Sequence, residues 1–108
     1  MASYLIIISS APDTGNSERA LSLAESVKED GNSITLFFIQ DGVRAAVNKE
    51  AALLNRLISS GVICYVLDED LRMRGFEKDL LLPKAEISGY NELVELMGTE
   101  GVSTLGAF

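Results

Sequence analysis

The stretch VICYVLDEDLRMRG, residues 62–75, decides the fold of this chain. It opens as an apolar run rich in strand-forming residues and then changes abruptly to acidic residues, followed by Arg74 and Gly75. In an open α/β sheet, functional groups gather where strands end and loops begin. The junction after Leu67 is therefore the first place to look for a site, and Cys64, the only cysteine, lies close to it.

Other runs of strand-forming residues share this character. Residues 4–8 and 33–39 are apolar almost throughout, as in 62–67, which is typical of strands buried on both faces of a parallel sheet. Shorter strands are predicted at 84–87 and 102–108. The sequence therefore predicts a sheet of roughly five strands.

Helical periodicity separates these strands. Periodicity predicts helices at 17–30, 44–60 and 90–97. Residues 68–73 are too short and charged for a core element, but an acidic turn ahead of Arg72 and Arg74 suits a short helix. Asn16 or Ser17 is placed to cap the first helix, and an interruption of the second near 47–49 is left open. Strands that alternate with helices predict an α/β fold: a single-domain (1–108) three-layer sandwich with a mostly parallel sheet and helices on both faces.

Composition excludes several classes of function. The net charge of -7 opposes binding to nucleic acids and to anionic membranes, so neither is predicted as a direct partner. With one cysteine and no histidine, the chain cannot form an internal disulfide, a Cys/His zinc site or a Ser-His-Asp triad. The apolar run at 4–8 is too short for a signal peptide or a membrane span, which predicts a cytoplasmic protein.

The loop SSAPDTGN, residues 9–16, follows a strand and opens a helix, where backbone amides can bind an anion. It lacks the Gly-Lys-Ser/Thr of a P-loop and the three spaced glycines of a dinucleotide site. We therefore interpret it as a connecting turn.

Asp41 follows the second strand, where receiver-type folds carry a phosphorylated aspartate. The acidic pair and the lysine that such a site also requires are missing after the first and last strands. Asp41 and Gly42 are interpreted as a turn, in which Asp bonds to its own backbone and Gly accepts a positive φ.

Asp68, Glu69 and Asp70 could form a metal site or an acid/base pair. Adjacent helical residues point in different directions, and acidic residues in a first turn complement the helix dipole, so a solvated helix start is favoured. No metal and no cofactor are predicted.

Cys64 lies between Ile63 and Tyr65 inside an apolar strand. Reactive cysteines occupy partly exposed, electropositive positions, whereas buried free cysteines behave as small apolar side chains. The structural role is favoured, and a sulfurtransferase that uses the Cys64 thiol stays as the alternative.

Three stretches together resemble one protein family. They are LFFIQDGVRAAV (36–47), VICYVLDEDLRMRGF (62–76) and ISGYNELVELM (87–97). Taken in this order, the three stretches resemble the motifs of the DsrE/DsrF/DsrH-like family, most of all those of its DsrH/TusB branch. The matching residues are Gln40, Asp41, Gly42, Val43, Ala45, Ala46, Val47, Glu69, Asp70, Leu71, Arg74, Gly75 and Tyr90.

The resemblance implies a protein that assembles into homomeric or mixed trimers or hexamers and takes part in sulfur relay with protein partners. In that relay a persulfide passes between cysteines, toward thiolation of transfer RNA wobble uridine or within sulfur oxidation. The sulfur-carrying cysteine of the DsrE-type subunit lies about eight residues before the Arg-Gly glycine, which is the position of Leu67 here. The persulfide role is therefore not assigned to Cys64.

The prediction is a relay component without the sulfur-carrying cysteine, more a non-catalytic partner than an enzyme. The loops after the second and third strands are expected to form a pocket or a subunit contact, and Arg72 or Arg74 is expected to steady an anionic sulfur on a partner. The residues assigned to this site are Gln40, Asp41, Gly42, Leu67, Asp68, Glu69, Asp70, Arg72, Arg74 and Gly75. A homo-oligomeric binding module for a small or regulatory ligand is the remaining alternative.

Overall fold

The computed structural model describes residues 2–49 and 51–108. Its sheet has five strands in the order β4-β3-β2-β1-β5, and every neighbouring pair is parallel. The strands are β1 (Ser3–Ile8), β2 (Ser33–Phe38), β3 (Ile63–Leu67), β4 (Ala85–Ser88) and β5 (Val102–Ala107). The predicted strands are confirmed. Strands β1, β2, β3 and β5 each have one end shifted by one residue from the prediction, and β4 is displaced by one residue as a whole.

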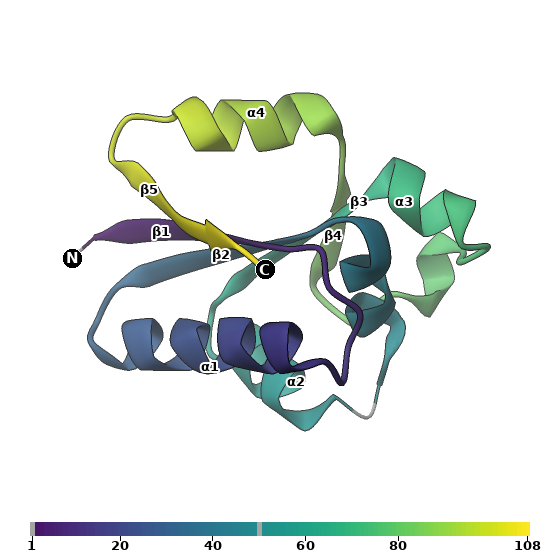
Figure 1. Ribbon diagram of the computed structural model, residues 1–108, viewed down its shortest axis with the longest axis horizontal. Coiled ribbons are helices and arrows are strands. Elements are labelled where there is room, and N and C mark those ends of the chain that lie inside the picture. Colours follow the sequence, from purple (N-terminus) through teal and green to yellow (C-terminus); the bar gives the residue numbers. More distant parts are fainter. Residues whose placement is uncertain (1, 50) are drawn as a thin grey trace.

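Helices cover both faces of this sheet (Figure 1). Helices α1 (Gly15–Glu29) and α2 (Ala52–Ser59) lie on one face, and α4 (Tyr90–Gly98) lies on the other. The chain advances from β1 to β4 in one direction and then returns across the sheet to β5. When the chain reverses the direction in which it adds strands, a right-handed crossover places the connecting helix on the opposite face of the sheet. The predicted three-layer α/β sandwich is confirmed.

Two short elements lie at the carboxyl ends of the central strands. The 3-10 helix η1 (Gln40–Val47) follows β2, and helix α3 (Asp68–Met73) follows β3 as predicted. A single 3-10 turn, η2 (Lys78–Leu80), leads toward β4. No helix among residues 2–49 and 51–108 is long and apolar enough to cross a membrane.

The single helix predicted at 44–60 is wrong. The structure has two elements there, and η1 ends at Val47, where the interruption had been left open. Glu50, which falls inside the predicted helix, lies outside the described residues. Both elements bury apolar side chains against the same core. The spacing of these side chains across 44–60 therefore imitates the 3.6-residue period of a single helix.

The predicted cap of α1 is also wrong. Thr14, not Asn16 or Ser17, is the N-cap residue, and its hydroxyl accepts a hydrogen bond from the Ser17 N–H at 3.2 Å. Thr14 has the extended backbone that a cap requires, with φ of -94° and ψ of 157°. Asn16 instead accepts a hydrogen bond from the Arg19 guanidinium.

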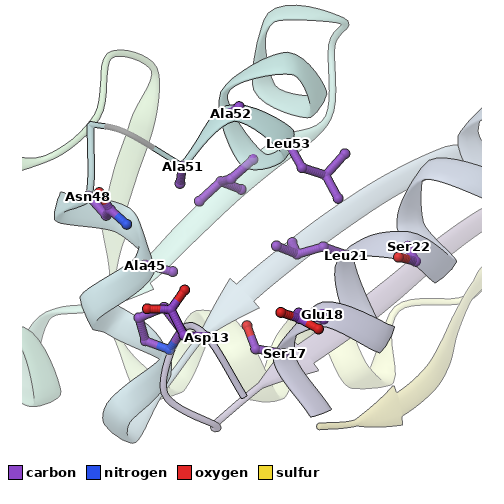
Figure 2. A pocket seen from close by; sticks show the side chains of 12 residues that line it. Asp13, Ser17, Glu18, Leu21, Ser22, Ala45, Asn48, Ala51, Ala52 and Leu53 are labelled. Atoms are coloured by element: carbon purple, nitrogen blue, oxygen red, sulfur yellow. The ribbon is translucent and has the colours of Figure 1, made fainter. Parts of the chain in front are cut away.

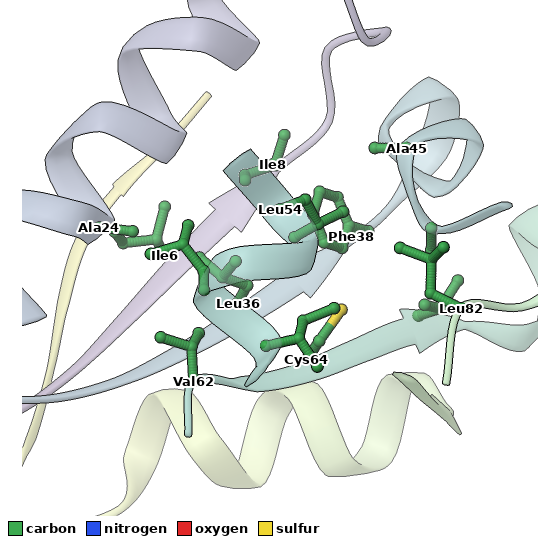
Figure 3. Packing of buried hydrophobic residues seen from close by; sticks show 14 of the residues in the cluster. Ile6, Ile8, Ala24, Leu36, Phe38, Ala45, Leu54, Val62, Cys64 and Leu82 are labelled. Atoms are coloured by element: carbon green, nitrogen blue, oxygen red, sulfur yellow. The ribbon is translucent and has the colours of Figure 1, made fainter. Parts of the chain in front are cut away.

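The strands divide their side chains between two apolar cores because alternate residues face opposite sides of a sheet. The larger core lies under α1 and α2 and includes Ile6, Leu36 and Cys64 (Figure 3). The smaller core lies under α4 and includes Ile7, Phe37, Leu67 and Leu93. Cys64 and Leu67 are therefore on opposite faces of β3.

Candidate functional site

The residues that the sequence marked at the ends of the second and third strands lie side by side in space. Strands β2 and β3 are parallel neighbours, with Phe38 opposite Val66. Their carboxyl ends therefore meet at one edge of the sheet, and η1 and α3 continue from them. This edge brings Gln40, Asp41, Asp70 and Arg74 together, and we call these four residues the Asp70 network.

Asp70 is the buried centre of the network. The residue is 7% exposed, and its carboxylate accepts a hydrogen bond of 2.6 Å from the backbone N–H of Gln40. Gln40 has φ of 49°, in the left-handed region that residues other than glycine rarely adopt. Asp70 thus holds the backbone of the β2–η1 junction in an unfavourable conformation by a bond to a charged acceptor, the stronger class of hydrogen bond.

Arg74 closes the network from the end of α3. Its Nε donates to Asp41 Oδ1 at 3.0 Å, and its Nη1 donates to the backbone carbonyl of Asp70 at 3.1 Å. Nη1 also lies 3.7 Å from Asp70 Oδ1, and the Arg74 side chain is 26% exposed. Gly75, with φ of 76°, ends the turn. The arginine therefore ties η1 to α3 with charges that are largely neutralised within the chain.

Asp41 and Gly42 do not form the predicted turn. The Asp41 carboxylate bonds to Arg74 rather than to its own backbone, and Gln40, not Gly42, has the positive φ. Gly42 is needed for space, since a Cβ built there would lie 2.1 Å from the carbonyl oxygen of Ile8. The same oxygen accepts the Ile39 N–H at 2.9 Å. A close contact between two backbones therefore explains why position 42 is a glycine. The sequence does not reveal such a contact.

The other assigned residues are distributed around the network. Asp68 pairs with Arg72 at 3.4 Å, while the side chain of Arg72 is 68% exposed. Glu69 and Gly75 are exposed, and Leu67 is fully buried under α4. Asp68 and Asp70 thus bond to different partners. The predicted solvated helix start is wrong for Asp70, which is buried against the β2–η1 junction. Within the described residues, no three His, Cys, Asp or Glu side chains are grouped to hold a metal ion.

Cys64 is sealed in the larger core, as expected. It is 1% exposed, and burial raises the pKa of its thiol from 9.0 to about 12, because the apolar surroundings disfavour the thiolate. Figure 3 shows it among Leu36, Val62 and Leu82. At neutral pH the thiol is protonated and shielded, whereas persulfide chemistry requires an accessible thiolate.

A cavity of about 410 Å³ lies away from the network, on the face covered by α1 and α2 (Figure 2). It is lined by the loop after β1, the first turns of α1, the end of η1 and the start of α2. We call it the α1 pocket, and its lining includes Asp13, Ser17, Glu18, Leu21, Ala45 and Leu54. Sequence reasoning treated residues 9–16 as a connecting turn and missed this pocket, since the elements that complete it lie far along the chain.

Comparison with known proteins agrees with this architecture. The model of the DsrE/DsrF-like family matches residues 2–102. Protein TusB from Photorhabdus laumondii is 38% identical over 61 residues, and this match spans 56% of the chain and 62% of the relative. The crystal structure of the YchN protein from E. coli has a TM-score of 0.88 at 20% identity over the full length of both chains. A protein of unknown function from Methanobacterium thermoautotrophicum has a TM-score of 0.71 at 20% identity, covering 95% of this chain and 97% of that one.

Proposed function

This chain belongs to the DsrE/DsrF-like family, and on that basis we propose that it is a component of a sulfur-relay assembly that does not itself carry the sulfur. The relay passes a persulfide between cysteines, toward thiolation of transfer RNA wobble uridine or within sulfur oxidation. The 38% identity to protein TusB supports the choice of branch. The assembly is a cytoplasmic trimer or hexamer, homomeric or mixed, that does not bind nucleic acid directly.

The burial of Cys64 is the observation that supports a role in which this chain does not carry the sulfur. The chain has one cysteine, it is 1% exposed, and its raised pKa keeps the thiol protonated. Position 67, where the DsrE-type subunit has its cysteine, is a leucine packed on the opposite face of β3. A persulfide on this chain would therefore need local opening of the larger core.

The surface next to the Asp70 network supports a docking role for α3. The network fixes α3 against η1, and Glu69, Arg72 and Met73 are exposed on the helix. Met73 is 80% exposed, and flexible, polarisable methionine side chains are common at protein-binding surfaces. Arg72, paired with a single carboxylate, can also approach an anionic sulfur on a partner.

Sulfur loading tests the role of the thiol. The folded protein is incubated with a cysteine desulfurase and labelled cysteine, and bound persulfide is measured by mass spectrometry against the Cys64→Ala variant. We expect no more label on the wild-type chain than on the variant. Rapid stoichiometric persulfide formation on Cys64 would instead establish the alternative, a cysteine-dependent sulfurtransferase.

Complementation tests the relay itself. In a host strain that lacks this gene, transfer RNA thiolation or sulfur oxidation is assayed after expression of Cys64→Ala, Arg72→Glu or Arg56→Glu. Arg56 is a matched control, because its side chain is 70% exposed and pairs with one carboxylate at 3.5 Å, and it lies on α2 rather than α3. We expect only Arg72→Glu to lose activity. If deletion leaves both sulfur pathways unchanged, the relay proposal is wrong.

A further inference from the structure

Helix α4 presents apolar side chains on two of its sides. Leu93 and Leu96 pack into the smaller core beneath the helix. Tyr90, Val94 and Met97 recur at helical spacing, which places them together on another side, and they are 48%, 67% and 51% exposed. We call these three residues the α4 stripe.

Such a stripe is unusual for the helices of this chain. Within the described residues, α1 and α2 expose no large apolar side chain to a comparable degree. Figure 1 shows no other helix of the described chain over the outer side of α4. A surface helix normally keeps one apolar face, turned toward its own core, and tyrosine and methionine are enriched in protein interfaces. The stripe therefore indicates a face that another protein covers.

The charge around the stripe has a single sign. Residues 85–108 contain four glutamates and no lysine or arginine, although the chain has nine basic residues. The four glutamates are exposed, and none forms an ion pair within residues 2–49 and 51–108: they are Glu86, Glu92, Glu95 and Glu100. Their charges are therefore not neutralised within the described chain.

The helix dipole has the same sign at the end of α4. The helix ends at Gly98 with no basic residue in its last turn, so no cation of the helix opposes the negative end of its dipole. The Thr99 hydroxyl donates to the Glu95 carbonyl at 2.6 Å, which satisfies one carbonyl of this turn without adding positive charge. A cation that approaches the C-terminal half of α4 is therefore favoured by the dipole and by the glutamates.

A second copy of this chain fits the face poorly. Two α4 helices packed together would bring Glu92 and Glu95 of both copies close to one another, with no cation from residues 85–108 between them. Any other surface of a second copy belongs to a molecule with a net charge of -7. Because like charges in contact oppose association, charge complementarity favours a different protein with a basic surface.

We propose that the α4 stripe docks a protein other than this chain, through a surface that combines apolar side chains with lysine or arginine. The apolar part of that surface packs on Tyr90, Val94 and Met97, and its cations approach Glu95 and the C-terminal end of α4. This face shares no residue with the Asp70 network, and the proposal does not depend on the sulfur-relay role.

Titration with two matched peptides tests the proposal. Both are amphipathic helical peptides with the same leucine positions, one with lysine and the other with glutamate at every polar position, and each is added to the ¹⁵N-labelled full chain. We expect saturable shifts of the α4 amides with the lysine peptide and none with the glutamate peptide. The affinity for the lysine peptide should fall severalfold at high salt, because exposed charges are screened. Equal binding of both peptides, shifts confined to other surfaces, or no saturable shift at millimolar lysine peptide overturns the proposal.

Substitutions separate the apolar and the charged contributions. Val94→Ser should weaken binding of the lysine peptide roughly tenfold at low and high salt, because apolar burial is lost. Glu95→Gln should weaken it roughly threefold, at low salt only. The controls are Leu80→Ser, at an apolar side chain of η2 that is 45% exposed, and Glu29→Gln, exposed at the end of α1, and both should bind as wild type. Wild-type affinity in a folded Val94→Ser protein, or an equal loss in Leu80→Ser, would overturn the assignment of the stripe.

The native mass of the protein tests the competing occupant, a second copy of the chain. Sedimentation is measured for the wild type and for Val94→Asp, with circular dichroism as the check that the variant is folded. We expect the same oligomeric state for both proteins, because the stripe makes no contact between copies. Dissociation of an oligomer in folded Val94→Asp would show that a second copy covers the stripe, and the proposal would be wrong.

Discussion

Gly42 shows how a single hydrogen atom in place of a side chain lets two backbones meet. The start of η1 passes so close to the end of β1 that any Cβ would overlap the carbonyl oxygen of Ile8. That oxygen already accepts the Ile39 N–H and is held in the centre of the sheet. Neither backbone can move without disturbing the β1–β2 pairing.

We therefore predict that Gly42→Ala lowers the free energy of unfolding by about 3 kcal/mol, as for severe overpacking in a core. Gly98→Ala is the control, because Gly98 lies at the end of α4 with no atom within 4 Å of the added Cβ. Alanine there should be neutral or slightly stabilising. Urea unfolding of the two variants measures both changes. Equal small effects would contradict the close contact.

Cys64 predicts a specific loss of stability in alkali. The thiol keeps its proton up to a pKa of about 12 in the folded protein, while the unfolded chain releases it near 9.0. Between these values the unfolded state binds fewer protons, so stability falls as pH rises, by up to about 1.4 kcal/mol per pH unit. Below the unfolded pKa the full contribution is present.

The comparison with Cys64→Ala isolates this contribution, since the two proteins differ only at this side chain. We expect the wild-type advantage in the free energy of unfolding to shrink steadily from pH 8.5 to pH 11. The measurement is urea unfolding across that range. Parallel pH curves for the two proteins would mean that the thiol is not buried as described.

At the scale of elements, the Asp70 network joins η1 to α3, two short segments that contribute little helical stability of their own. Asp70→Ala removes the acceptor of the Gln40 N–H and leaves Arg74 without one of its partners. Removal of a buried charged hydrogen-bond acceptor costs roughly 2 kcal/mol. The loss should be concentrated at the β2–η1 junction.

We therefore predict that Asp70→Ala lowers the free energy of unfolding by about 2 kcal/mol and speeds hydrogen exchange of the Gln40 amide. Asp79→Ala, at an exposed position of η2, should change neither quantity. Native-state exchange followed by NMR makes the measurement. An unchanged Gln40 exchange rate in Asp70→Ala would show that this bond does not hold the junction.

The same elements show what the sequence could and could not predict. Alternation of apolar runs and helical periods predicted the strands, α1 and α4, because each buries a regular pattern. Helix α3 was predicted from its acidic first turn ahead of Arg72 and Arg74. The division of 44–60 into η1 and α2 was not predictable, because both segments bury one side against the same core. The network escaped prediction too, although all four of its residues had been marked, because its bonds join positions about thirty apart, as from Gln40 to Asp70.

At the scale of the whole molecule, the surface around α3 and the α1 pocket lie in different regions. The surface around α3 lies at the ends of β2 and β3, whereas the α1 pocket lies between helices on the face of the larger core. The topology predicted from sequence placed the first region but not the second, which depends on how α1, η1 and α2 pack.

The return of the chain across the sheet also sets an order of assembly. Strand β1 pairs with β5, with Ser3 opposite Val102, so one edge of β1 stays unpaired until a strand far along the chain is in place. Until then, that edge and the apolar face beneath α4 stay open to water and to other nascent chains. Such long-range pairing slows folding and exposes an aggregation-prone intermediate. Because β5 comes after α4, this edge of β1 is closed only once the chain beyond α4 is in place.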